Sequence, residues 1–307
     1  MSREDTMAEQ IPHGTRLHRL VEHLRHGEGL GLATGAARQA ARGVRSVVRV
    51  GDAAGRARMV RLLAESALGR EEDQRPASSA RPFRVPELGD RIVWLRPRSR
   101  DLRAFQFLAE GHHMPPADMP GPVRHIAVFG ANIGLLLADL ADEYPEARVL
   151  GVEPDTDNAV LARRNLEHLG GRGRIVETAV WHRDATLQVG WDRDAWGVNI
   201  TDTAPEQPPA ASDDSLQPRI EAADAGRILA DWTGGAPVDY LLVSVESAWQ
   251  ELLAHGDWAR DVRCIKVEIS DARTVAVADE AVPMLEKLGF RARLQTLPWG
   301  AFAIGLR

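Results

Sequence analysis

The segment HIAVFGANIGL, residues 125–135, carries the strongest chemical signal in the chain. An apolar run typical of a buried strand leads into a turn with Gly130, Ala131, Asn132 and Gly134, and a helical pattern follows. Glycines at such a turn let the backbone pass close to a ligand held at a helix N-terminus. The spacing is not GxGxxG, which disfavours NAD, and the lack of GKS or GKT excludes a P-loop nucleotidase. Taken alone, the segment also fits a tight turn without a ligand.

An acidic residue follows the next predicted strand. The apolar run 148–152 ends in Glu153 and Pro154, about 20 residues beyond the first glycine. An acid at the carboxyl end of the second strand can accept hydrogen bonds from two ribose hydroxyls. Helix capping or solvent exposure is the alternative for Glu153 alone, but the pairing of the two motifs favours a ribose contact.

These motifs need a sheet whose strands end at one edge. Apolar runs of strand type occur at 125–129, 148–152, 174–180, 238–245 and 263–269, and helical patterns separate several of them. Such alternation predicts an α/β fold with a mostly parallel sheet covered on both faces. Residues 290–297 and 301–306 flank a Pro-Trp-Gly turn and predict a final antiparallel hairpin.

Several of these segments resemble one family. GANIG at 130–134, GVEPD at 151–155, RNL at 164–166 and AV at 179–180 are similar to the FkbM-like branch of class I S-adenosylmethionine-dependent methyltransferases. Residues 238–248 resemble the fourth-strand block VDLLKIDVEGAE of that family, residues 267–269 its fifth-strand VEI, and residues 96–101 its short upstream segment. The resemblance covers about residues 90–307.

The resemblance implies a Rossmann-like class I methyltransferase sheet, mostly parallel with an antiparallel last strand, and S-adenosyl-L-methionine as cofactor. The glycine turn would cradle the methionine and sugar part, and Glu153 would hold the ribose. Trp181 would border the adenine, where its ring either stacks on the base or packs as an ordinary core residue. The residues expected at the cofactor are Gly130, Ala131, Asn132, Gly134, Glu153, Pro154, Thr178, Ala179 and Trp181.

Four positions depart from the family pattern. Val128 stands where an acid usually precedes the first glycine, and Ser247 replaces a glycine of the fourth-strand block. Leu242 and Ser244 replace the lysine and the aspartate of that block. These departures motivate an alternative function, a methyltransferase-like binding subunit that has lost catalysis.

The implied reaction is methylation of a hydroxyl on a small or medium acceptor, such as a sugar or natural product. It needs alignment and a group that removes the acceptor proton. Glu246 is the first candidate for this base, Glu268 the second and His182 the third, although a histidine in a His-Arg-Asp turn is more often a surface residue. His112 and His113 resemble a metal pair only superficially, so a solvent-facing turn and no metal are expected.

Composition limits the compartment and the partners. The 307 residues are 44% hydrophobic and 27% charged, as in soluble globular proteins, and the net charge of −6 disfavours nucleic acid as a partner. The single cysteine, Cys264, excludes an intramolecular disulfide and indicates a reducing compartment. Because a signal-peptide pattern and a long apolar run are both lacking, a cytoplasmic protein without a membrane partner is expected.

The chain is predicted to divide into two parts. Residues 1–82 read as a helical segment and linker, and residues 83–307 as the methyltransferase domain, with the cofactor core from about residue 121. Four arginines between residues 38 and 49 share one helical face and motivate a less favoured alternative, an RNA methyltransferase. A cap over the acceptor site or a homodimer contact is the preferred role of the first segment. The Pro-rich residues 204–218 are expected to form a lid or a plain loop.

Overall fold

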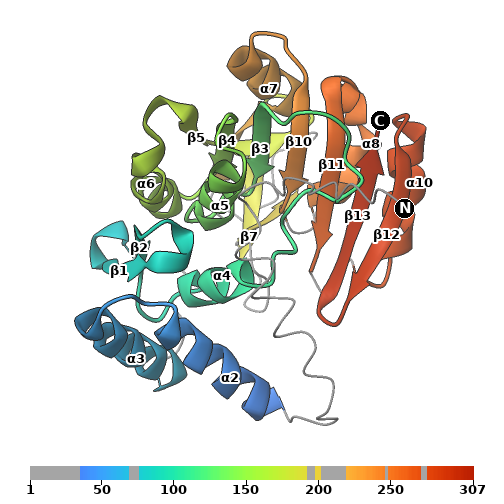
Figure 1. Ribbon diagram of the computed structural model, residues 1–307. Coiled ribbons are helices and arrows are strands. Elements are labelled where there is room, and N and C mark those ends of the chain that lie inside the picture. The colour runs from blue at the N-terminus through green and yellow to red at the C-terminus, as the bar shows by residue number, and fades with distance from the viewer. Residues whose placement is uncertain (1–34, 69–75, 192–197, 202–218, 246–247, 271–274) are drawn as a thin grey trace, which may run out of the picture.

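A seven-stranded sheet forms the centre of the computed structural model, which describes residues 35–68, 76–191, 198–201, 219–245, 248–270 and 275–307 (Figure 1). In spatial order its strands are β12 (Arg291–Leu297), β13 (Gly300–Leu306), β11 (Val262–Ile269), β10 (Val238–Val243), β3 (His125–Phe129), β4 (Arg148–Glu153) and β5 (Gly173–Glu177). Neighbours from β5 to β11 pair in parallel, whereas β13 runs antiparallel to both of its neighbours. The predicted α/β fold class, a mostly parallel sheet with an antiparallel last strand, is confirmed.

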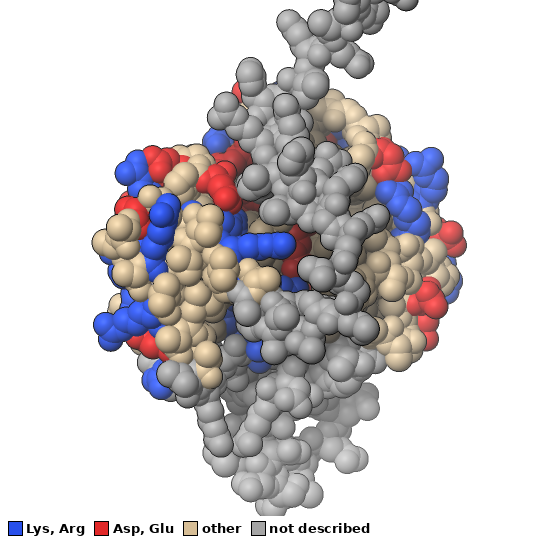
Figure 2. Space-filling view, turned by 60° about the horizontal axis from the view of Figure 1, so that its bottom comes forward, with Lys and Arg blue, Asp and Glu red and all other residues tan. Residues whose placement is uncertain are grey.

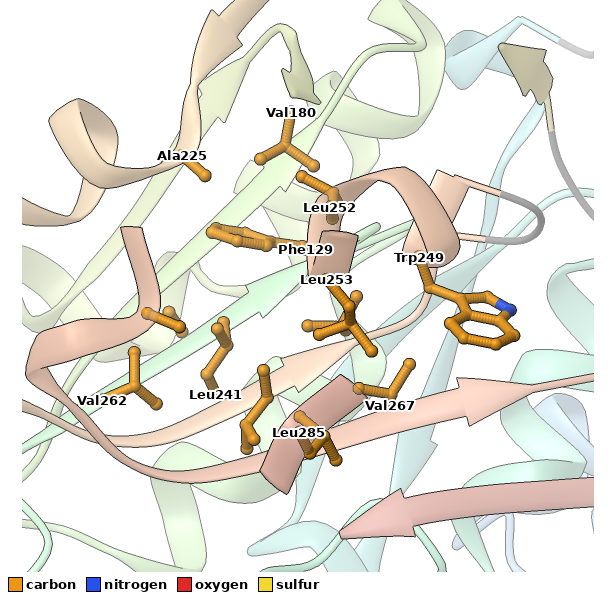
Figure 3. Close-up of a cluster of buried hydrophobic side chains, with 14 of the residues drawn as sticks. Phe129, Val180, Ala225, Leu241, Trp249, Leu252, Leu253, Val262, Val267 and Leu285 are labelled. Atoms are coloured by element: carbon orange, nitrogen blue, oxygen red, sulfur yellow. The ribbon is translucent and has the colours of Figure 1, made fainter. Parts of the chain in front are cut away.

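Helices cover both faces of this sheet, as its apolar strands require. On one face lie α5 (Leu135–Glu143) and α6 (Thr156–Asn165), with α4 (Asp101–Leu108) packed on α5, and on the other face lie α7 (Ala225–Thr233), α8 (Trp249–Ala254) and α10 (Ala281–Lys287). All six residues of β10 are buried, which is typical of a parallel strand covered on both sides. Figure 3 shows the core on the second face, where Phe129 and Leu241 of the sheet meet Leu252 and Leu253 of α8.

An antiparallel hairpin and two further helices precede the sheet in the chain. They are α2 (Gly35–Val48), α3 (Ala53–Leu68), β1 (Arg81–Val85) and β2 (Arg91–Leu95). Their apolar side chains form one cluster with residues of α4, the glycine turn and α6, including Met59, Phe83, Leu95, Phe105, Ile133 and Leu161. The apolar run RIVWL at 91–95 predicts β2 from the sequence, whereas its partner β1 was not predicted. The domain boundary predicted at residue 82 stays a prediction.

A second, four-stranded sheet flanks the carboxyl end of β5. Its order is β6 (Ala179–Trp181), β9 (Arg219–Asp224), β7 (Ala185–Trp191) and β8 (Val198–Thr201). The single strand predicted over residues 174–180 is therefore two strands, β5 and β6, which belong to different sheets. The Pro-rich residues 204–218 lie outside the described residues.

Short 3-10 helices complete the described elements. They are η1 (Ala77–Ser79), η2 (Pro86–Leu88), η3 (Glu167–Arg172), η6 (Gly256–Asp261) and η7 (Ala278–Glu280). Within the parts of the chain that the structure describes, no helix has both the length and the apolar character needed to cross a bilayer.

Candidate cofactor and active site

The turn after β3 has a backbone that only small or polar residues adopt readily. Gly130, Asn132 and Gly134 all have positive φ, at 78°, 48° and 78°. A Cβ built on Gly130 would lie 2.0 Å from the carbonyl oxygen of Ser244, just beyond β10. A Cβ on Gly134 would lie 3.0 Å from the Cα of Ala162 in α6. Gly130 therefore lets the turn approach the end of β10, and Gly134 lets α5 begin against α6.

Glu153, at the carboxyl end of β4, binds this turn. Only 6% of the residue is exposed, and its Oε2 accepts a hydrogen bond from the backbone N–H of Asn132 at 2.7 Å. Its Oε1 accepts from the N–H of Asp155 at 3.1 Å and from Nδ2 of Asn158 at 3.2 Å. Burial raises the pKa of Glu153 to about 7, and these hydrogen bonds oppose the rise. The two motifs singled out in the sequence are thus joined directly.

The residues predicted on the adenine side follow β5. Ala179 and Trp181 are each 1% exposed and belong to a small core cluster with Leu187 and Ala222. The hydroxyl of Thr178 donates to the carbonyl oxygen of Glu221 at 3.1 Å. Trp181 thus packs as a core residue, the alternative that the sequence left open, and a stacking role would require its ring to become exposed. The cofactor roles of these residues stay predictions.

His182, the third candidate base, lies beside another imidazole. Its ring centroid is 4.1 Å from that of His255, which follows α8, and 5.3 Å from that of Trp181. His182 is partly exposed, so its ring has access to solvent. His182 takes no part in the hydrogen bond between Ser244 and Glu268 at the ends of β10 and β11. Its catalytic role stays a prediction.

Ser244 and Glu268 meet where β10 and β11 end. The Ser244 hydroxyl donates to Oε2 of Glu268 at 2.8 Å, and its backbone N–H donates to the carbonyl oxygen of Phe129 at 2.8 Å. Burial raises the pKa of Glu268, and hydrogen bonds from Ser244 and Ser270 oppose that rise. Glu268 is therefore tied through Ser244 to the same edge as Gly130. Glu246, the first candidate base, lies outside the described residues.

Lys266 is a buried cation at this edge that the sequence analysis missed. It is 4% exposed, and its Nζ donates to the carbonyl oxygen of Met114 at 3.1 Å and lies 4.6 Å from the ring centroid of Phe302. Burial lowers the pKa of Lys266 to about 8. Its charge favours the carboxylate form of Glu268, which stands two residues later on the same face of β11.

His113 is buried, so the solvent-facing turn expected for it from the sequence is wrong. It is fully buried rather than solvent-facing, because Nε2 lies 2.9 Å from Oδ2 of Asp139 and Tyr240 donates to its carbonyl oxygen at 2.7 Å. Asp139 and Tyr240, polar residues inside apolar stretches, are the sequence signal that a buried partner exists. Among the residues the structure describes, no three His, Cys, Asp or Glu side chains are grouped to hold a metal ion.

The edge formed by these strand ends faces the bottom of Figure 1. Figure 2 turns that side forward and shows a hollow at its centre, with basic and acidic side chains on its walls. The positions of Gly130, Glu153 and Glu268 agree with the general rule that open α/β sheets bind ligands outside the carboxyl ends of their strands.

Comparison with protein-family models gives no match, and comparison with curated proteins gives none. Among solved structures, the chain is similar to a precorrin-6Y C5,15-methyltransferase from Geobacter metallireducens, at 12% identity and TM-score 0.36, over 61% of this chain and 81% of that one. It is also similar to an O-methyltransferase family protein from Burkholderia thailandensis, at 12% identity and TM-score 0.39, over 68% of this chain and 60% of that one. A third similar structure is cofactor-bound Rv0187 from MTB, at 18% identity and TM-score 0.37, over 66% of this chain and 88% of that one. Because these TM-scores are below 0.5, the chain's own strand order remains the basis for its fold class.

Proposed function

We propose that the chain is an S-adenosylmethionine-dependent O-methyltransferase of the FkbM-like kind, acting on a hydroxyl of a small or medium acceptor such as a sugar or natural product. The observation that carries the proposal is the buried carboxylate of Glu153, hydrogen-bonded to Asn132 of the glycine turn at the carboxyl edge of the sheet. The proposal includes a cytoplasmic setting and a homodimer contact or acceptor cap formed by the N-terminal segment.

The residues at this edge suit the cofactor in two respects. A carboxylate offers roughly four acceptor positions, of which Glu153 uses three, so it retains capacity for a ribose hydroxyl. A side chain at Gly130 would collide with Ser244, so this glycine keeps the turn beside the end of β10, where Ser244 binds Glu268. The bound cofactor would supply a methyl group on a sulfonium, which needs no covalent nucleophile from the protein.

The task left to the protein is to hold the acceptor and take its proton. Glu268 is suited to this because Ser244 fixes one of its oxygens and the charges of Lys266 and His113 oppose the effect of burial on its pKa. The proton moves from the acceptor hydroxyl to the carboxylate as the new carbon–oxygen bond forms. Glu246 is the competing candidate for the same role.

A methyl-transfer assay tests this proposal and separates the two glutamates. We expect ¹³C-methyl-labelled S-adenosylmethionine to label an oxygen in a panel of sugars and phenols, which the carbon chemical shift of the product identifies. Glu268→Gln should lower kcat about 100-fold, the ordinary worth of a general base, with S-adenosylhomocysteine affinity retained. An equal loss in Glu246→Gln alone would transfer the role to Glu246.

Other outcomes of the same assay would overturn the proposed reaction. Label on nitrogen or carbon would contradict O-methylation, and cofactor binding without any transfer would support the non-catalytic binding subunit. Transfer to RNA is disfavoured, because two of the four arginines between residues 38 and 49 already form ion pairs with carboxylates of this chain. Arg42 pairs with Glu110 at 2.9 Å, and Arg49 with Glu87 at 2.8 Å.

A further inference from the structure

Arg96, between β2 and α4, sits at the centre of a buried hydrogen-bond network. It is 5% exposed, and its Nε and Nη2 donate to the two carboxylate oxygens of Asp101 at 2.9 and 2.7 Å. Its Nη2 also donates to Oδ1 of Asn158 in α6 at 2.6 Å. One guanidinium thus connects the segment before the predicted cofactor core to a helix within it.

The contact with Arg96 fixes which way the Asn158 amide faces. A guanidinium carries only donors, so the amide oxygen of Asn158 must face Arg96 and its NH₂ must face the other way. There the NH₂ donates to Oε1 of Glu153 at 3.2 Å. If the amide turned over, it would set its NH₂ against the guanidinium and its oxygen against the carboxylate.

A second asparagine of α6 ties the same upstream strand to the glycine turn. Asn165 is 3% exposed, and its Nδ2 donates to the carbonyl oxygen of Ile133 at 2.8 Å. Its Oδ1 accepts from the backbone N–H of Trp94 in β2 at 2.8 Å. Helix α6 therefore links the end of β2 to the glycine turn through Asn165, and the segment after β2 to Glu153 through Asn158.

We infer that Arg96 is a positioning residue for cofactor binding, which holds Glu153 in place for the ribose by orienting Asn158. This rests on the proposed function, since it assigns a role at the same site. It makes the segment upstream of residue 121 a working part of that site. Without Arg96, the Asn158 amide would be free to rotate and Glu153 would lose one of its three donors.

Calorimetric titration with S-adenosylhomocysteine at a series of pH values tests the inference. Arg96→Met should weaken binding about 10-fold, the loss of one charge-assisted hydrogen bond to the site. The pH midpoint of binding should also rise, because donation from Asn158 lowers the pKa of Glu153. A merely structural role would not move that midpoint. Arg96→Lys should restore little, since an ammonium cannot reproduce the planar fork.

Asn158→Asp keeps the inference testable if Arg96→Met does not fold. Aspartate still accepts from Arg96 and leaves its pair with Asp101 intact, but it sets a second carboxylate beside Glu153. We expect a loss in affinity greater than that of Arg96→Met and a larger upward shift of the midpoint. Arg61→Met, at a side chain 75% exposed on α3, is the matched control and should change neither quantity.

Failure of the inference and failure of the proposed function give different results. If the unmodified protein binds S-adenosylhomocysteine and Asn158→Asp binds it equally well with the same midpoint, the positioning role of Arg96 is refuted. If the unmodified protein does not bind it, the proposed function fails. In that case the contact from Arg96 through Asn158 to Glu153 is tested by ¹³C NMR titration of the Glu153 carboxyl. Asn158→Asp must still raise the pKa of Glu153.

Discussion

Gly130→Ala is expected to lower the free energy of unfolding by about 3 kcal/mol or more and to abolish S-adenosylhomocysteine binding. The added methyl would lie 2.0 Å from the carbonyl oxygen of Ser244, a backbone atom that a side-chain rotation cannot move away. Overpacking of this kind costs about 1–3 kcal/mol, and a positive φ at alanine adds about 1–2 kcal/mol. Urea unfolding and calorimetry measure the two effects.

Gly289→Ala is the matched control for this variant. Gly289 has φ of 84°, close to that of Gly130, but no atom outside its chain neighbours lies within 4 Å of a Cβ built there. It should lose only the cost of the backbone conformation, about 1–2 kcal/mol, and keep cofactor binding. Equal losses in the two variants would contradict the close approach of the turn to the end of β10.

Glu153→Ala is expected to weaken S-adenosylhomocysteine binding about 100-fold, equivalent to roughly 2.7 kcal/mol. The variant removes the carboxylate proposed to accept a ribose hydroxyl, and a hydrogen bond to a charged group is worth about 1.5–3 kcal/mol. It also leaves the N–H of Asn132 without its acceptor, which loosens the turn.

The control for that variant is Glu286→Ala, an exposed glutamate of α10 on the far part of the sheet. Calorimetry should find its affinity unchanged. If Glu153→Ala also bound S-adenosylhomocysteine with the affinity of the unmodified protein, Glu153 would not belong to the cofactor site.

Local patterns were enough to predict the elements that position the site. The runs at 125–129 and 148–152 became β3 and β4 because parallel strands buried on both faces are apolar throughout. The glycines at 130 and 134 were recognisable because the turn has positive φ, which strains other residues. The hydrogen bond from Asn132 of the turn to Glu153 was not predicted, and it forms because β3 and β4 pair side by side.

Pairing between strands was harder to predict. The apolar run 174–180 gave no sign that β5 and β6 would join different sheets, since the choice of partner depends on strands far away in the chain. β1 was missed because Arg81 and Pro82 open it, and it pairs only with β2 at the edge of the molecule.

Buried polar residues were the largest omission within the site. The sequence analysis expected His113 in a solvent-facing turn and gave Lys266 and Arg96 no place in the core, because charged and polar residues are mostly exposed. Each has a partner distant in the sequence, Met114 for Lys266, Asp139 for His113 and Asn158 for Arg96, which also pairs with the nearby Asp101. Such partners are fixed by the tertiary fold, and no local spacing encodes them.

The most direct test of the cofactor assignment is calorimetric titration of the unmodified protein with S-adenosylhomocysteine on either side of pH 7. Because the pKa of Glu153 is raised to about 7, its ribose-accepting carboxylate form dominates above that pH and is lost below it. We predict saturable binding at one site per chain, whose affinity falls by up to about tenfold per pH unit below the midpoint. No saturable binding at any pH, or an affinity indifferent to pH, would contradict the account.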